Sequence, residues 1–175
     1  MNRKLIYLFL FLFLQNQAFA QERNLIITDV QQVLFLGNSI TYSGEYLAYL
    51  ETIYRLQHPE SKINWINLGL PSETVSGLSE EGHADGAFPR PDLHERLDRI
   101  FGSIQPDLVF VNYGMNDGIY LPFDSTRFKK YAEGMLWLDT KIQAIGASAL
   151  FLTPPIYDPI KGEAYSNTLD QYAAW

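Results

Sequence analysis

Four short apolar runs, separated by segments with helical spacing, constrain the fold of this chain more than any other feature. The runs are "VLFL" (33–36), "INWINL" (63–68), "LVFVNY" (108–113) and "ALFLT" (149–153). Three of them are continuous rather than alternating, which is typical of strands buried on both faces of a parallel sheet. We therefore expect four strands in a sheet that helices cover.

Three helices are predicted between these strands, because apolar residues recur there every three or four positions. The sets are Leu47, Leu50, Ile53 and Tyr54; Leu93, Leu97, Ile100 and Phe101; and Phe128, Tyr131, Met135, Leu138 and Ile142. Pro91 and Asp92 suit a first helical turn, Ser125 or Thr126 a cap, and Gly146 a helix end. This alternation predicts a flavodoxin-like α/β/α sandwich with a parallel sheet in the order 2-1-3-4.

Two segments fall outside this pattern. The stretch 69–90 is long, irregular and rich in Gly, Ser and Glu, and loops of that length in compact domains are usually functional or mobile. The last residues, "YSNTLDQYAAW", predict a helix that Ser166 or Asn167 caps ahead of Leu169 and Tyr172.

The N-terminus predicts export. Arg3 and Lys4 precede an apolar run, and a polar stretch then ends in Ala18-Phe19-Ala20. The run has about half of the ~20 residues that a membrane-spanning helix needs. This is the pattern of a secretory signal peptide over residues 1–20, which leaves a single domain at 21–175 that is secreted or periplasmic and has no stable membrane anchor. The absence of cysteine excludes disulfides, thiolate metal sites and a lipid-modified cysteine.

The charge balance excludes one class of partner. The net charge is -7, and no basic cluster follows the signal peptide. Because nucleic acid binding requires a basic footprint, we expect no nucleic acid partner. An uncharged or cationic ligand fits better, and the oligomeric state stays open.

The chemistry gathers where the predicted strands end. Asn38 and Ser39 follow the first run, Gly69 follows the second, and Asn116 and Asp117 follow the third. Ligand sites of open parallel sheets lie beyond the carboxyl ends of the strands. A hydroxyl, a glycine N–H and a carboxamide at one edge are a nucleophile with an oxyanion hole, so Ser39, Gly69 and Asn116 are the candidate catalytic residues.

Each of these residues also has a purely structural interpretation. Ser39 could be a helix N-cap, and Gly69 could supply a left-handed turn. Asn116 and Asp117 could form an Asx-turn, as could Asn38. The simultaneous presence of all three residue types at three strand ends favours the catalytic interpretation.

The segments "GNSI", "NLGLPSETVSG" and "YGMND" resemble the first three motif blocks of the SGNH hydrolases, also called GDSL-type esterases and lipases. The resemblance runs from Val33 to about Pro155, with Asn38 in place of the usual aspartate. It implies that Ser39 is the nucleophile and that Gly69 and Asn116 complete the oxyanion hole. It also implies an Asp-x-x-His block near the C-terminus, which would supply the rest of the triad.

The base is the missing part. No Asp-x-x-His and no fifth apolar run follow Pro155, which indicates a domain that is incomplete in this chain, poorly soluble and nearly inactive alone. His58 and His94 are interpreted as surface residues, and His83, beside Asp85 in the long loop, as the alternative internal base. The expected position of the catalytic His and Asp is therefore beyond Trp175.

The sequence thus predicts a secreted serine esterase that acts on acetyl or short acyl esters, with carbohydrate esters suggested by the resemblance. Lipid esters remain an alternative, as does a non-catalytic sugar- or anion-binding module. A phosphate loop is disfavoured because "GNSITYSGE" lacks the required lysine and glycine spacing. We expect no cofactor, and His83 with Asp85 makes a weak metal site.

Overall fold

A four-stranded parallel sheet forms the centre of the molecule in a computed structural model that describes residues 29–118, 121–155 and 169–175. Its strands are β1 (Gln32–Gly37), β2 (Asn64–Asn67), β3 (Leu108–Asn112) and β4 (Ser148–Phe151). They are ordered β2-β1-β3-β4, and every neighbouring pair is parallel. The predicted order 2-1-3-4 is confirmed.

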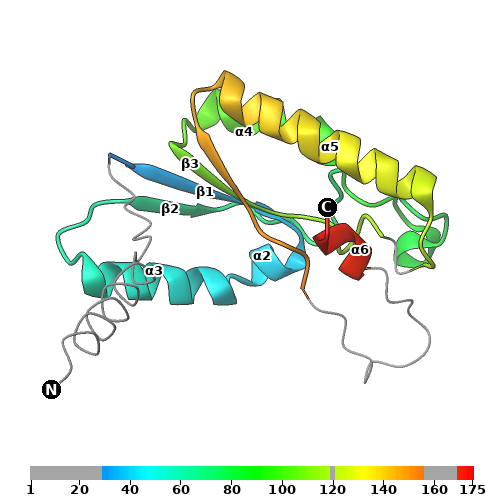
Figure 1. The fold of residues 1–175 in the computed structure, drawn as a ribbon, viewed down its shortest axis with the longest axis horizontal. Helices are drawn as coiled ribbons and strands as arrows, with labels where there is room; N and C mark the ends of the chain where they lie inside the picture. The colour runs from blue at the N-terminus through cyan, green and yellow to red at the C-terminus, as the bar shows by residue number, and fades with distance from the viewer. Residues whose placement is uncertain (1–28, 119–120, 156–168) are drawn as a thin grey trace, which may run out of the picture.

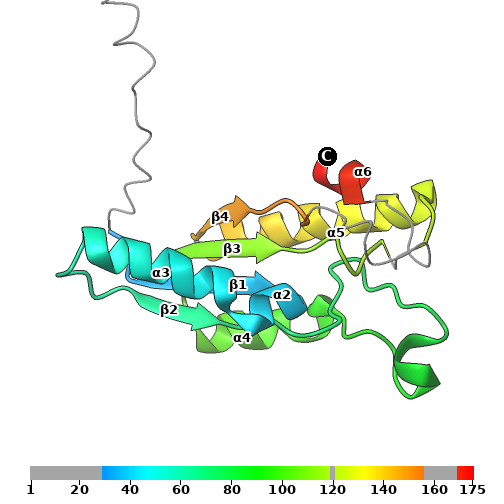
Figure 2. The ribbon, with the colours of Figure 1, turned by 90° about the horizontal axis from the view of Figure 1, so that it is seen from below.

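Helices cover both faces of the sheet (Figure 1). On one face lie α2 (Ser39–Ser43) and α3 (Glu45–Gln57), and on the other lie α4 (Leu97–Ser103) and α5 (Ser125–Ala144). Figure 2 shows these two layers from below, with the long loop after β2 extending beyond the carboxyl ends of the strands. That loop contains the 3-10 turn η1 (His83–Gly86), and a second turn, η2 (Leu93–Glu95), precedes α4. The predicted three-layer sandwich is present.

Alternation along the central strands divides the core into two clusters. One cluster joins Leu34, Leu36, Val109 and Val111 of the sheet to α4 and α5, and the other joins Val33, Phe35, Leu108 and Phe110 to α3. Five of the six residues of β1 and all of β3 are buried, which explains why their sequences are continuously apolar. The edge strands β2 and β4 are more exposed, and β2 begins and ends with an asparagine.

Local backbone signals move three helix boundaries from where they were predicted. Gly44, with φ of 74°, separates α2 from α3. Arg96 separates η2 from α4, and Asp92, expected within the first helical turn together with Pro91, is instead the N-cap of η2. The expected cap of α5 was wrong, because the Asp124 carboxylate accepts the Arg127 N–H at 2.7 Å in place of a Ser125 or Thr126 hydroxyl.

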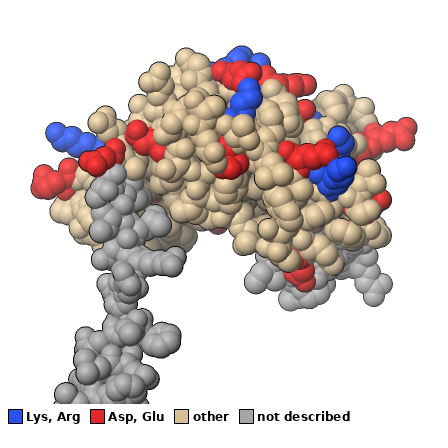
Figure 3. Space-filling model, turned by 45° about the horizontal axis from the view of Figure 1, so that its top comes forward, with Lys and Arg blue, Asp and Glu red and all other residues tan. Residues whose placement is uncertain are grey.

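The chain ends in α6 (Leu169–Ala173), which packs its Tyr172 ring against Phe128 and Tyr131 of α5. The helix that "NTLDQYAAW" predicts is therefore present, whereas its expected cap at Ser166 or Asn167 lies outside the described residues, as does the predicted signal peptide. No helix in the described ranges is long and apolar enough to cross a bilayer. Acidic and basic side chains are interspersed on the face seen in Figure 3.

Candidate active site

Ser39 stands at the carboxyl end of the central strand β1, as the first residue of α2, and is exposed. The cap of α2 is Asn38, whose Oδ1 accepts the N–H of Ile40 at 3.0 Å. The interpretation of Ser39 as the N-cap is therefore wrong, because its neighbour performs that task. Since α2 has only five residues, the positive electrostatic potential at Ser39 comes from the free N–H groups of a single helical turn, not from the dipole of a long helix.

Gly69 packs directly against α2. A Cβ added to it would lie 2.3 Å from the backbone N of Tyr42 and 2.7 Å from the carbonyl carbon of Thr41. Gly69 is not among the residues with positive φ, so the interpretation as a left-handed turn is wrong. The position requires glycine because only a residue without a side chain lets the β2 loop approach the helix that carries Ser39.

The N–H of Gly69 has an acceptor that sequence reasoning missed. It donates to Asn67 Oδ1 at 2.9 Å, and Asn67 Nδ2 donates in turn to the Thr41 carbonyl oxygen at 2.7 Å. This is an Asx-turn on β2, with the exposed Asn67 bridging to α2. The Gly69 N–H, a candidate oxyanion donor, is therefore hydrogen-bonded to the Asn67 side chain in this structure.

Asn116 lies beyond the end of β3 and is only 4% exposed. Its Nδ2 donates to the main-chain oxygen of Glu73 at 3.0 Å, so the carboxamide is held from the second motif block, 43 residues away. The structure thus brings Ser39, Gly69 and Asn116 to the carboxyl ends of β1, β2 and β3, which are neighbours in the sheet. Their roles in catalysis stay predictions.

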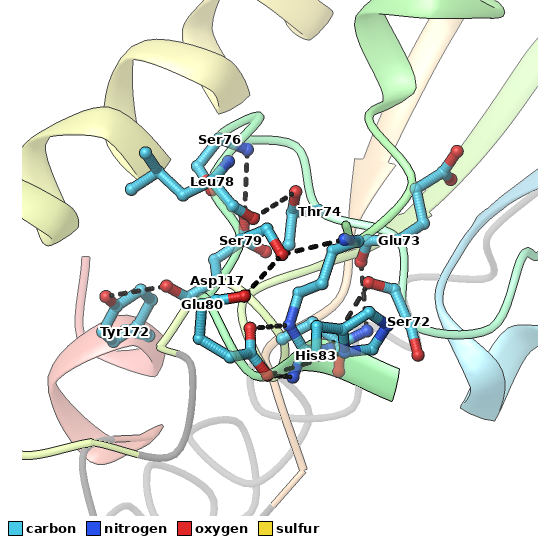
Figure 4. A network of polar contacts seen from close by, with 12 residues as sticks. Ser72, Glu73, Thr74, Ser76, Leu78, Ser79, Glu80, His83, Asp117 and Tyr172 are labelled. Atoms are coloured by element: carbon cyan, nitrogen blue, oxygen red, sulfur yellow. Dashed lines mark hydrogen bonds and ion pairs between the residues drawn. The ribbon is translucent and has the colours of Figure 1, made fainter. Parts of the chain in front are cut away.

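Asp117 ties the loop after β3 to the loop after β2. Its fully buried carboxylate accepts the N–H groups of Val75 at 3.0 Å and Ser76 at 2.8 Å, and that of Gly114 at 3.0 Å. Burial raises the pKa of Asp117, and these hydrogen bonds act in the opposite direction. Figure 4 shows Asp117 between Ser76 and Tyr172. Asp117 therefore does more than close a local Asx-turn.

Glu73 forms a second buried bridge between the same loops. Its carboxylate accepts the Tyr113 hydroxyl at 2.6 Å and a bidentate pair from Arg96, at 2.5 Å from Nε and 2.7 Å from Nη2. Burial raises the pKa of Glu73, which the bonds from Arg96 and Tyr113 only partly offset. Burial of the Tyr113 hydroxyl, together with the negative charge of the neighbouring Glu73, raises the pKa of Tyr113 well above its usual value.

An ion pair and a hydrogen bond tie the middle of the long loop to its end. We call this group of Ser79, Glu80 and Arg90 the clasp. Arg90 donates to both carboxylate oxygens of Glu80 at 2.6 Å, and its N–H donates to Ser79 Oγ at 2.9 Å. Figure 4 shows Glu80 beside His83. His83 Nδ1 lies 3.6 Å from Glu80, and its ring meets Phe88 edge-on. This histidine therefore lies beside the clasp.

None of the three histidines hydrogen-bonds Ser39 within the described ranges. His58 packs on Tyr54 at the end of α3, and His94 hydrogen-bonds Asp92 at 2.6 Å while stacking on Trp137. In the same ranges no group of three or more His, Asp or Glu side chains gathers in a way that could hold a metal ion. What the described residues place at the carboxyl ends of three neighbouring strands is a hydroxyl and two amide groups.

Comparison with known proteins identifies the fold of the chain. No protein-family model matches the chain, and no curated protein matches it in sequence. Solved structures do match, among them Axe2, an acetyl xylan esterase from Geobacillus stearothermophilus (TM-score 0.60, 22% identity, covering 82% of this chain and 68% of that one). A variant of Axe2 that is described as an acetyl-xylooligosaccharide esterase matches with TM-score 0.60 and 22% identity over 81% of this chain and 68% of that one.

A second protein matches equally well. It is LAE5, an alpha/beta hydrolase enzyme from the metagenome of Lake Arreo, Spain, with TM-score 0.60 and 21% identity over 82% of this chain and 69% of that one. Variants of Axe2 in a serine, an aspartate and a histidine are described as catalytic mutants. At these identities the likeness concerns the fold, and it agrees with the motif resemblance: this chain has the fold of the SGNH-type esterases.

Proposed function

We propose that the protein is a secreted serine esterase in which Ser39 forms an acyl-enzyme. One observation carries the proposal: an exposed serine, not used as a cap, begins the helix after β1, Gly69 packs against that same helix, and Asn116 follows the neighbouring strand β3. Structural neighbours with this fold are described as an acetyl xylan esterase and an alpha/beta hydrolase enzyme, which supports the same reaction class.

In the proposed reaction, Ser39 Oγ attacks the ester carbonyl carbon and loses its proton to a base. The tetrahedral oxyanion accepts hydrogen bonds from the Gly69 N–H and the Asn116 amide, each worth on the order of 10²–10³ in rate. The bond to the alcohol then breaks, the alcohol leaves with the proton, and water hydrolyses the acyl-enzyme. To bind, the oxyanion displaces Asn67 Oδ1 from Gly69, which costs little because Asn67 is exposed.

The base is expected from the Asp-x-x-His block that the family resemblance implies. Axe2 supports this expectation, since its aspartate and histidine variants, three positions apart, are described as catalytic mutants. For the substrate we propose an acetyl or short acyl ester on a carbohydrate. Axe2 is described as an acetylxylan esterase, and one of its variants as an acetyl-xylooligosaccharide esterase.

The test compares Ser39→Ala with Ser43→Ala in the full-length protein, on 4-nitrophenyl acetate and on acetylated xylo-oligosaccharides. Ser43 also lies on α2 and is exposed, and its Oγ only donates to the Ile40 carbonyl oxygen. We expect Ser39→Ala to abolish turnover at an unchanged melting temperature, and Ser43→Ala to keep turnover. Retained turnover in Ser39→Ala would refute the assignment.

A second candidate, a non-catalytic module for a sugar or small anion, has a specific observation in its favour. The Gly69 N–H already donates to Asn67 Oδ1, and no histidine in the described part of the chain hydrogen-bonds Ser39. A fluorophosphonate probe separates the two candidates, because only an activated serine reacts with it. Covalent labelling of Ser39 supports the esterase, whereas saturable sugar binding without labelling supports the module.

A further inference from the structure

Arg96, between η2 and α4, joins two parts of the site that no local signal in the sequence connects. Besides its bidentate pair with Glu73, Arg96 Nη2 donates to the Leu68 carbonyl oxygen at 2.7 Å. The Arg96 side chain is 18% exposed and the Glu73 side chain is fully buried. Arg96 thus hydrogen-bonds the loop after β2 at the peptide group that joins Leu68 to Gly69.

The contact with Leu68 matters because of what lies at the other end of that peptide group. The carbonyl of Leu68 and the N–H of Gly69 belong to one planar unit, so a bond that holds the oxygen also fixes the direction of the N–H. A cationic donor on the carbonyl further polarises the peptide, and hydrogen bonds in such chains strengthen one another. Arg96 therefore both aims and strengthens the Gly69 N–H as a donor.

The same ion pair also supports the other amide donor. Glu73, held through its carboxylate by Arg96 and Tyr113, presents its main-chain oxygen to Asn116 Nδ2 at 3.0 Å. One guanidinium thereby sets the positions of the Gly69 peptide and of the residue that holds the Asn116 carboxamide. The Tyr113 hydroxyl donates to the Glu73 carboxylate, whereas the donor to the Leu68 carbonyl oxygen is Arg96, so the two arms can be separated by substitution.

Stability alone explains this ion pair poorly. Removing a carboxylate and a guanidinium from water costs several kcal/mol per ion, and apolar residues of similar volume often serve a core equally well. The exposed pairs of this chain, such as Lys141 with Asp98, carry no such cost. A buried pair that holds a peptide oxygen of the candidate site is better explained by what it positions.

We propose that Arg96 is a positioning residue of the oxyanion hole, which orients the Leu68–Gly69 peptide directly and the Asn116 carboxamide through Glu73. This inference rests on the proposed esterase function and names a determinant of its rate that lies outside the three motif blocks. Arg96 touches neither the nucleophile nor the reacting ester.

The test measures kcat and KM for 4-nitrophenyl acetate with Arg96→Lys, which keeps the charge but cannot hold both Glu73 oxygens and the Leu68 carbonyl. We expect kcat to fall about 10- to 100-fold, as displaced catalytic donors do, with KM nearly unchanged. Arg99→Gln is the matched control on α4, because Arg99 is exposed and, among the described residues, donates to the Glu95 carbonyl oxygen alone. It should keep wild-type kinetics.

A readout that does not depend on turnover accompanies the kinetics. The Gly69 amide resonance should move upfield in proton shift in Arg96→Lys, since its peptide loses a cationic partner, and should stay in place in Arg99→Gln. If Arg96→Lys does not fold, Glu73→Gln replaces it, because it keeps the volume and one acceptor oxygen, and the same fall in kcat is expected. Tyr113→Phe, which leaves Leu68 untouched, should lower the melting temperature with a smaller loss of kcat.

The outcomes separate the two levels of the proposal. Unchanged kcat and an unmoved Gly69 resonance in folded Arg96→Lys or Glu73→Gln overturn the positioning role, even when Ser39→Ala confirms the esterase. Retained turnover in Ser39→Ala overturns the esterase itself. A fall of kcat that Tyr113→Phe reproduces in full, with the Gly69 resonance unmoved, assigns the effect to general loosening of the core and also refutes the inference.

Discussion

Replacing Gly69 with alanine tests how the fold places the nucleophile. The new Cβ would lie 2.3 Å from the Tyr42 backbone N, where ordinary contacts begin at 3.4 Å. The loop after β2 and the first turn of α2 must therefore separate by about 1 Å. The obstacle is backbone on both sides, so no side-chain rotation relieves it.

Two magnitudes follow from this displacement. Overpacking of this kind costs about 1–3 kcal/mol of unfolding free energy, and a shift of about 1 Å between nucleophile and donors costs about 10²-fold in rate. Both are measurable, by thermal unfolding and by turnover of 4-nitrophenyl acetate. We expect kcat to fall far more than the melting temperature suggests.

Gly102→Ala is the matched control. Gly102 lies within α4, with nothing within 4 Å of an added Cβ, and should gain up to about 1 kcal/mol from the better helix propensity of alanine. Gly69→Ala with wild-type kcat and melting temperature would refute both the close approach of the loop to α2 and its role in placing Ser39.

Three further predictions concern other parts of the chain. Asn67→Ala should cost about 1 kcal/mol of unfolding free energy but keep or raise kcat, because it uncovers the Gly69 N–H; a loss of kcat would show that the oxyanion does not use this donor. Burial acts to raise the pKa of Glu80, but the hydrogen bonds from Arg90 outweigh it and hold this pKa below its usual 4.5. The clasp therefore stabilises the fold above pH 4.5 and loses that effect as the pH falls through the lowered pKa, so Glu80→Gln should cost about 1 kcal/mol at pH 7 and nothing at strongly acid pH; a difference that persists there would contradict the mechanism. Export should yield a mature chain that begins at Gln21, which N-terminal sequencing of secreted protein checks, and an uncleaved cytoplasmic protein would refute the signal peptide.

The sheet could be predicted from the sequence because its information is local. β1 and β3 are apolar along their length since both faces are covered, and their polar ends mark the carboxyl edge. The crossover rule for parallel strands then leaves few possible orders. Gly69 and Asn116 were found in the same way, as small or amide residues at strand ends.

Residues that act through distant partners could not be predicted. Glu73 and Arg96 are 23 positions apart, and Glu73 and Asn116 are 43 apart, so no periodic pattern links them. Neighbouring residues of similar chemistry were also confused: Asn38 rather than Ser39 caps α2, and Asp124 rather than Ser125 or Thr126 caps α5. Such choices depend on where the backbone turns, which the residue types alone leave open.

If Ser39 is the nucleophile, it carries the acyl group of the substrate during turnover, and this covalent intermediate can be trapped. The full-length protein is mixed with excess 4-nitrophenyl acetate, quenched in acid within the first turnover, and digested for peptide mass spectrometry. We expect one added acetyl group on the peptide that contains Ser39, and none on the corresponding peptide of Ser39→Ala. Turnover without acylation of Ser39, or acetyl found only on another residue, would contradict the role of Ser39 as the nucleophile.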